Sequence, residues 1–294
     1  MSYTFKPIAL SLLTCALQAC SSGSSGGFSS GGASGFTGTV SATGSAIAAD
    51  TTTNPSDGSI AFADAAPTAG PLLEFDVVND QLTEIRVSDS EVDIVLDLTD
   101  PDTRFATLPD GLAIATPDLS AVAIFGAEPR ITFEHQTFGA WMAGPTTGSG
   151  TAGAGTFGDP TPTSNAPINI GVYRGIGTGI YQTDDGDVFV TSNNFNVSIR
   201  PAEDRLTISS NNTVGVNVAT GEEMTLNTLN FNFGFGVLSG ITFTADVADL
   251  DDRTGTATGT FYGPNAEELG GVFQVKDATS SHIGAFGTER ITAP

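Results

Sequence analysis

Apolar and polar residues alternate with a period of two in the C-terminal half of the chain. In residues 229–237, Asn and Gly occupy one parity, and the other parity holds Leu229, Phe231, Phe233, Phe235 and Val237. Such alternation places one row of side chains on the core face of a β-strand, so we expect this aromatic row to point inward. Residues 241–247 repeat the pattern, and Ser239-Gly240 between the two segments fits a tight hairpin.

Further strand-like segments fill the rest of this half. They are separated by turn sequences rich in Asp, Glu and Gly, at 184–187, 201–204, 219–223 and 249–255. Short strands at this spacing, with many interior glycines that ease curvature, favour closure into a barrel. The pattern predicts an all-β protein in which residues 132–294 form an eight-stranded antiparallel β-barrel.

Two regions precede the predicted barrel. Residues 71–131 contain short apolar or alternating runs such as LLEFDVV (72–78) and LTEIRV (82–87), so we expect a small β-rich, handle-like module there. Residues 20–70 are dominated by Ser, Gly, Ala and Thr. Such a segment buries too little apolar surface to offset the entropy of ordering it, and we expect a disordered, flexible tether.

The first 19 residues have the layout of a secretory signal peptide. Lys6 is followed by a short apolar run and then by Leu17-Gln18-Ala19-Cys20. Leu-x-Ala-Cys resembles the bacterial lipobox, in which the Cys thiol is acylated. The sequence therefore predicts lipidation at Cys20, with a soluble secreted product as the alternative. Cys15 would be removed with the leader, which excludes disulfides, thiolate zinc sites and Cys nucleophiles from the mature chain.

The charge balance is strongly acidic, with 33 Asp and Glu against 10 Lys and Arg. Nucleic acid is a poor partner for such a surface, because neutralising its phosphates requires many Lys and Arg side chains. Direct adsorption to anionic lipid is disfavoured for the same reason. Contact with a membrane is therefore expected only through the N-terminal lipid.

One stretch of the C-terminal half carries a family resemblance. FYGPNAEELGGVF (261–273), together with HQTFGAWMAGPTTGSGTAG (135–153), resembles the β-barrel domain of the transferrin-binding protein B family of surface lipoproteins. The likeness covers residues 132–294 and, more loosely, the preceding β module. The structural signature comprises Tyr262, Gly263, Pro264, Glu268, Gly270 and Gly271.

The residue types of the same motif also predict its local structure. Gly263-Pro264 should end a strand, because Pro cannot donate to the ladder. Asn265 should cap a short helical turn, with Glu268 reaching back to it in a variant of the capping box. Gly270-Gly271 should adopt the left-handed conformation that ends the turn. These residues are therefore expected to be structural rather than ligand-binding.

Other candidate chemistry is sparse. His135 and His282 are expected to be hydrogen-bonded strand residues rather than haem or metal ligands, and Trp141 is expected in the core. The acidic segments 184–187 and 249–252 lack the spacing of a calcium loop and sit where turns are expected. We find neither a P-loop nor a dinucleotide-binding glycine motif in a strand–helix context. The sequence predicts no enzyme activity, no cofactor and no metal site.

The resemblance implies a role. Family members are outer-membrane lipoproteins, often at the cell surface, that bind host proteins or iron carriers, and several deliver cargo to a TonB-dependent transporter. We therefore expect a lipid-anchored, surface-exposed protein that binds an unknown protein or an iron- or haem-type ligand, with palmitate on Cys20. An adhesion or shielding lipoprotein without a transport role is the alternative. The chain has material for only one handle-plus-barrel lobe, which argues against transferrin itself as the ligand.

Overall fold

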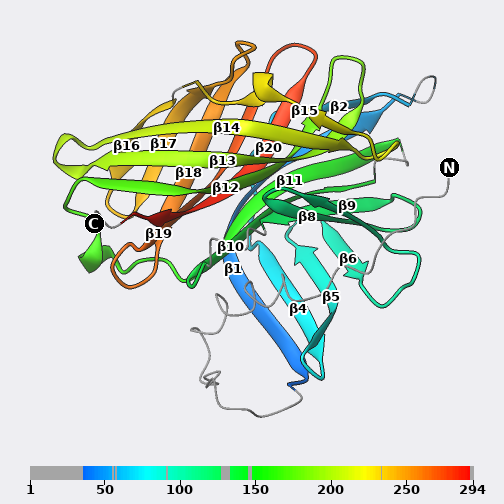
Figure 1. Cartoon of the computed structure of the whole chain (residues 1–294), viewed down its shortest axis with the longest axis horizontal. Helices are drawn as coiled ribbons and strands as arrows, with labels where there is room; N and C mark the ends of the chain where they lie inside the picture. Colours follow the sequence, from blue (N-terminus) through cyan, green and yellow to red (C-terminus); the bar gives the residue numbers. More distant parts are fainter. Residues whose placement is uncertain are drawn as a thin grey trace.

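The protein consists of two antiparallel β-sheets that pack against each other (Figure 1). The computed structural model describes residues 36–54, 56, 58–90, 92–126, 133–144, 148–232 and 234–291. The predicted signal peptide and Cys20 lie outside these residues, as does Phe233. The helical segments of the described part are short 3-10 turns, and none is long enough to cross a membrane. The all-β prediction is confirmed.

The first sheet is curled and has the strand order β6-β5-β4-β1-β11-β10-β9-β8-β7, with β2 and β3 paired to β1. Its strands are β1 (Gly38–Thr53), β2 (Ile60–Phe62), β3 (Ala66–Pro67), β4 (Leu72–Val78), β5 (Gln81–Ser88), β6 (Asp93–Asp97), β7 (Arg104–Leu108), β8 (Gly111–Ala115), β9 (Ala121–Gly126), β10 (Gln136–Ala143) and β11 (Ser149–Gly158). We call this sheet the handle.

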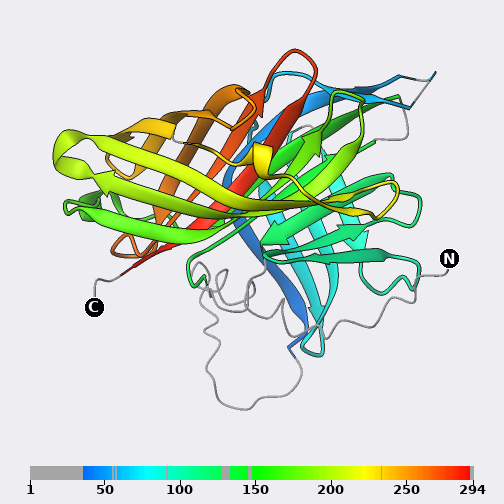
Figure 2. The ribbon, with the colours of Figure 1, turned by 45° about the horizontal axis from the view of Figure 1, so that its top comes forward.

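The second sheet closes on itself as an eight-stranded barrel, because β13 pairs with both β12 and β14. Its strands are β12 (Gly171–Gln182), β13 (Val188–Arg200), β14 (Arg205–Asn217), β16 (Gly234–Ser239), β17 (Thr242–Ala248), β18 (Thr254–Tyr262), β19 (Glu268–Lys276) and β20 (Ser281–Arg290). Strand β15 (Glu223–Thr225) adds to β14, and 3-10 turns lie at η2 (Thr163–Asn165), η3 (Pro201–Glu203) and η4 (Asn227–Leu229). Figure 2 shows the barrel lying across the handle.

The boundary between the two sheets differs from the sequence-based expectation. Strands β10 and β11 fall inside the predicted barrel region, 132–294, but they pair with β9 and β1 of the handle. The closed barrel starts at Gly171. The reason is that β11 pairs with β1, which lies about 100 residues earlier in the chain. Local periodicity predicts strands but does not predict which distant strand each one pairs with.

The predicted tether is also too long. Residues 38–53 form β1, which lies in the middle of the handle between β4 and β11. Residues 60–67 then run over the outside of the barrel as a strap. The amide of Ala65 donates to Gln274 Oε1 at 2.7 Å, Gln274 Nε2 donates to Ala63 O at 2.9 Å, and Asp64 forms an ion pair with Lys276.

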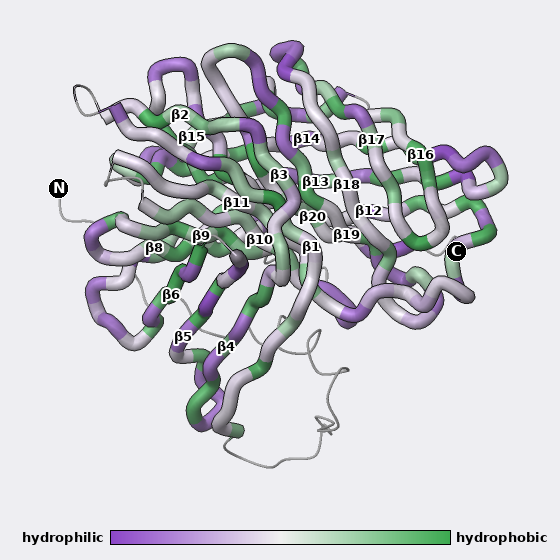
Figure 3. Tube along the Cα trace, turned by 180° about the vertical axis from the view of Figure 1, so that it is seen from behind, coloured by the Kyte–Doolittle hydropathy of each residue, from purple (hydrophilic) through white to green (hydrophobic). Residues whose placement is uncertain are grey.

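Three large apolar clusters, and a smaller one of Tyr181, Phe189 and Leu229, hold the described part of the chain together. One fills the barrel interior and is dominated by aromatic side chains, including Tyr173, Phe195 and Phe286. A second fills the curl of the handle around Phe75 and Trp141. The third lies between the two sheets and contains residues from both. The hydropathy of the chain fits this arrangement, since many of the connecting turns are hydrophilic (Figure 3).

In residues 229–237 the side chains do not follow the predicted alternation throughout. Leu229 and Phe231 are buried as predicted, but Phe235 is 57% and Val237 63% exposed. The predicted single strand is interrupted: it comprises η4, an isolated bridge at Phe231 and then β16 from Gly234. The parity changes across this break, and Gly234 and Gly236 occupy the inward positions of β16. In β17 the prediction holds, because Phe243, Ala245 and Val247 are all buried.

Candidate functional site

The signature motif lies where the barrel meets the handle. Tyr262 is buried, and its hydroxyl accepts a hydrogen bond from Thr156 Oγ1 of the handle strand β11 at 3.0 Å. Beside it, Thr161 donates to the carbonyl of Gly263 at 2.7 Å, and Asn165 Nδ2 donates to the carbonyl of Pro264 at 2.8 Å. The motif therefore attaches the end of the barrel to the segment that leads out of the handle.

Glu268 makes a second attachment at the same junction. It is 4% exposed, and its Oε1 accepts the backbone amides of Glu134 at 2.6 Å and His135 at 3.2 Å. Burial raises the pKa of this carboxyl to about 7, although the two amide hydrogen bonds act in the opposite direction. The expected contact between Glu268 and Asn265 is wrong. The neighbouring Glu267 makes it, accepting the Asn265 amide at 2.7 Å.

The two glycines after this turn have a different role from the predicted one. Gly270 and Gly271 lie within β19, and the left-handed conformations of the turn are found at Gly263 (φ 81°) and Ala266 (φ 58°). A side chain at Gly270 would overlap Gln136 and Thr156 of the handle. At this position glycine permits close approach between the two sheets rather than a turn.

The structure does not bring the two histidines together. His282 points into the barrel, where it is fully buried and Nε2 lies 2.9 Å from Thr191 Oγ1. Burial, with a smaller effect of Arg253, lowers the pKa of His282 to about 3, so the ring is neutral. His135 instead lies at the Glu268 end of β19, about 23 Å away along the barrel by strand rise. Among the described residues, no cluster of His, Cys, Asp and Glu could hold a metal ion.

A buried ion pair, missed in the sequence, closes the barrel end near His282. Arg253 Nε donates to Asp249 Oδ2 at 2.7 Å, and both side chains are almost fully buried. The guanidinium also lies over the Tyr181 ring, 5.3 Å from its centroid. The Asp-x-x-x-Arg spacing in the turn was the available signal. Asp249 also accepts the backbone amide of Arg253, so this acidic turn is held together by its own Asp and Arg residues.

Aromatic side chains of the described residues pack closely inside the barrel. Phe195 stacks on Phe286 with ring centroids 4.5 Å apart, and Phe231 meets Phe273 edge-on at 4.9 Å. An eight-stranded barrel is just wide enough to be filled by such side chains. This packing favours binding on the outer surfaces of the protein.

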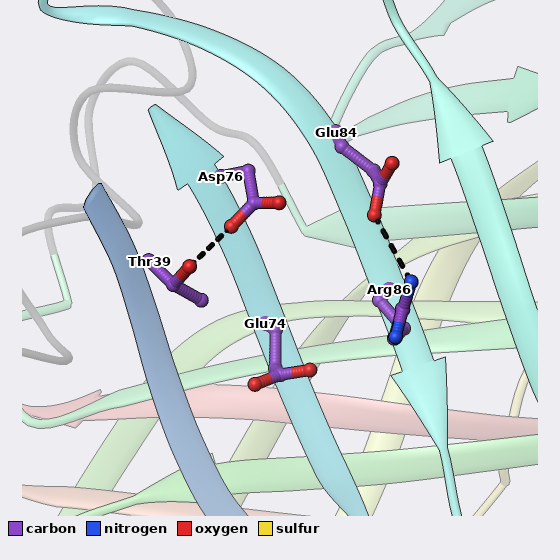
Figure 4. Close-up of a pocket in the computed structure, with 5 residues that line it drawn as sticks. All are labelled: Thr39, Glu74, Asp76, Glu84 and Arg86. Carbon is purple, nitrogen blue, oxygen red and sulfur yellow. Dashed lines mark hydrogen bonds and ion pairs between the residues drawn. The ribbon is translucent and has the colours of Figure 1, made fainter. Parts of the chain in front are cut away.

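An open recess of about 160 Å³ lies on the outer face of the handle (Figure 4). It is lined by Thr39 of β1, Glu74 and Asp76 of β4, and Glu84 and Arg86 of β5. Thr39 Oγ1 donates to Asp76 Oδ1 at 2.5 Å, and Arg86 pairs with Glu84 at 3.5 Å. The recess presents carboxylates on a sheet surface and suits contact with cationic groups of a partner. The alternating pattern of β4 indicated that Glu74 and Asp76 share one face of the strand. The pairing of β4 with β1 and β5, which completes the recess, could not be predicted from the sequence.

Comparison with known protein families gives a match to part of the chain. Residues 186–290 match the family model of the C-lobe and N-lobe β-barrels of transferrin-binding protein B. Most of the barrel is therefore similar to the β-barrels of that family. No curated protein matches the sequence.

Several solved structures align with much of this chain at low sequence identity. A transferrin-binding protein B double mutant from Haemophilus parasuis is 11% identical, with 86% of this chain and 76% of that chain covered and a TM-score of 0.45. HpuA from Kingella denitrificans, solved with human haemoglobin, is 14% identical (87% and 88% covered, TM-score 0.42). Transferrin-binding protein B from serogroup B Neisseria meningitidis is 11% identical (77% and 53% covered, TM-score 0.42).

Proposed function

We propose that this protein is a surface-exposed outer-membrane lipoprotein, anchored through Cys20, that captures a protein or an iron- or haem-carrying ligand. The observation that carries the proposal is the match of the barrel to the transferrin-binding protein B family. The aromatic packing inside the barrel supports it, because such packing favours binding on the outer surfaces, which suits a macromolecular ligand. Catalysis has no part in this proposal.

A role as accessory to a TonB-dependent transporter completes the proposal. Affinity capture with the full-length protein from intact cells should recover such a transporter or an iron-carrier protein. Deletion of the protein should slow growth when iron is supplied only on that carrier. Repeated capture of neither, with growth unaffected by iron limitation, would overturn the transport role. Capture of a host macromolecule under those conditions would favour adhesion.

The anchor is tested separately. Labelled palmitate should incorporate into the wild-type protein and be absent from Cys20→Ala, and protease added to intact cells should degrade the wild-type protein. Incorporation that persists in the variant would exclude Cys20 as the lipidation site. Resistance to protease on intact cells, with sensitivity after lysis, would show that the protein faces the periplasm and is not exposed at the cell surface.

A further inference from the structure

Exposed large apolar side chains are concentrated at one end of the barrel. Ten such side chains are exposed in the described part of the chain, and six of them lie on or next to β12, β16 and the end of β20 (Figure 1). An exposed apolar patch of this kind marks a surface that binds a partner. We call the six residues the apolar strip: Ile168, Ile170, Val172, Phe235, Val237 and Ile291.

Strand register joins the strip into one surface. Val172 and Ile291 are neighbours, because the Ile291 amide donates to the Val172 carbonyl at 2.8 Å. Across the barrel wall, Ser198 of β13 and Thr207 of β14 lie between Val172 and Phe235. These four strand positions form the first row of the surface.

A second row runs beside the first. Arg200 lies opposite Arg205, and Arg205 lies opposite Val237. Ile170 lies at the other end of this row, because the next residue along the chain, Gly171, pairs with Ile199. Both rows therefore have apolar side chains at their two ends and polar side chains in the middle.

The charges on and around the rows nearly cancel. Three exposed guanidiniums are balanced by four exposed carboxylates, which leaves a local charge of −1 on a chain whose net charge is −23. These groups are Arg174, Arg200, Arg205, Glu203, Asp204, Asp246 and Glu289. Arg200 pairs with Glu203 at 3.4 Å, and Glu289 lies opposite Arg174. A strongly charged partner therefore gains little here, whereas two copies of this acidic chain can approach each other through a nearly neutral surface.

The apolar ends of the two rows match each other under two-fold rotation. The interface of a two-fold dimer uses the same patch on both partners. An axis that runs across the strands, between the rows, lays the first row of one copy on the second row of the other. Phe235 then meets Val237 of the second copy, and Val172 meets Ile170. Each apolar side chain is thereby covered by another.

The polar centres also match under this rotation. Arg200 and Arg205 of one copy meet the hydroxyl groups of Ser198 and Thr207 of the other, which can accept hydrogen bonds from guanidinium groups. An axis along the strands would instead place Arg200 on Arg205 and bring like charges together. The arrangement across the strands is therefore the favoured one.

We propose that the apolar strip is the interface of a homodimer, and that its occupant is the strip of a second copy of this chain. This proposal goes beyond the capture function and does not depend on the ligand. The rows span three strand spacings, roughly 14 Å. They bury much less than the about 800 Å² per partner of a standard interface, so we expect a dissociation constant weaker than about 1 μM.

Sedimentation equilibrium tests the dimer. The chain from residue 21 onward keeps every described residue, and it should pass from monomer to dimer as its concentration rises. Phe235→Asp and Ile170→Asp should each weaken the dimer by at least about tenfold, because each buries a carboxylate at the interface. Val95→Asp, at an exposed position of the handle, is the matched control and should dimerise like wild type. All three variants should keep the melting temperature of wild type, since the replaced side chains are exposed.

Single cysteines test the position of the interface. The chain from residue 21 onward has no cysteine of its own, so Val237→Cys supplies one reactive thiol. A short bis-maleimide should link Val237→Cys into a covalent dimer, and Phe235→Asp in the same chain should abolish the link. Val95→Cys should stay monomeric under the same conditions.

Three results would overturn the proposal. The first is a chain that remains monomeric up to about 1 mM. The second is self-association that Phe235→Asp and Ile170→Asp leave intact. The third is a monomer that floats with phosphatidylcholine vesicles and loses this property in the strip variants, which would assign the strip to a lipid surface. Each of these results leaves the capture function to its own tests.

Discussion

Glu268 is a carboxylic acid held inside the protein at the junction of the handle and the barrel. Its ordinary pKa is 4.5, and burial raises it to about 7. Between these two values the folded protein binds a proton that the unfolded chain has released. Stability from this group is therefore fully present below about pH 4.5 and is lost as the pH rises through about 7.

We expect Glu268→Gln to flatten the pH dependence of stability across this window. Wild type should lose up to about 3 kcal/mol of unfolding free energy between pH 4.5 and 8, and the variant should lose markedly less. The measurement is denaturant unfolding at a series of pH values. Glu267→Gln is the control: hydrogen bonds from Asn265 overcome burial and lower the pKa of Glu267, so its contribution is lost only at more acidic pH. Equal slopes in wild type and Glu268→Gln would contradict the assignment.

At the scale of the element, the alternation of apolar and polar residues predicted the strands well. It gave the wrong inward-facing residues where a strand is interrupted. The aromatic run of residues 229–237 reads as one unbroken strand, yet only its first half follows that phase. At Gly234, a side chain would overlap Ile208 and Val247 from neighbouring strands. Side chains from other strands therefore already fill the barrel interior next to Gly234. Their positions depend on how the barrel closes, so the local sequence alone could not predict them.

This correction predicts opposite outcomes for two phenylalanines of the run. Phe231→Ala removes a buried ring that contacts Phe195 and Phe273, and should destabilise the protein by about 3–5 kcal/mol. Phe235→Ala removes an exposed ring and should change stability by less than about 0.5 kcal/mol. Thermal or denaturant unfolding of both variants decides the matter. Similar large losses would mean that both rings face the core, as the simple alternation implied.

Strand β1 was missed because its composition is that of a linker. Its residues are mainly Ala, Ser, Thr and Gly, which by themselves bury little apolar area. In the structure, small residues are needed there: a side chain at Gly44 would overlap the backbone of β11, and Ala48 and Ala49 face Gly153 and Ala152. The same limit applies to the handle recess, whose residues come together only through cross-strand register.

A charge placed in β1 tests whether this segment is part of the core. Ala49 is 2% exposed, so Ala49→Asp would bury a carboxylate in the cluster between the sheets and should destabilise the protein by more than about 3 kcal/mol. Ser45→Asp, on an exposed position of the same strand, should have little effect. Limited proteolysis and thermal unfolding distinguish the two. Tolerance of Ala49→Asp would restore the interpretation of this segment as a tether.

At the scale of the whole molecule, the handle and the barrel share one core. Strands β10 and β11 contribute Ala140, Met142 and Ala154, and the outer wall of the barrel contributes Ile180 and Ile283. Each sheet therefore covers the apolar face of the other. The signature motif and Glu268 add hydrogen bonds between the two sheets at the same junction. We therefore expect one cooperative unfolding transition for the described part of the chain.

The barrel alone should not be a stable, soluble unit. A fragment of residues 171–291 would expose Ile176, Ile180 and Ile283, which are at most 1% exposed in the whole protein. We expect it to self-associate in size-exclusion chromatography, because a contiguous apolar patch on a sheet face promotes aggregation. Replacing these three residues with Thr keeps the β-branched character of the strands and should shift the fragment towards monomer. In the full-length protein the same replacements should destabilise, since they bury hydroxyl groups between the sheets. A monomeric, cooperatively folded wild-type fragment would show that the handle is a separate module rather than half of a common core.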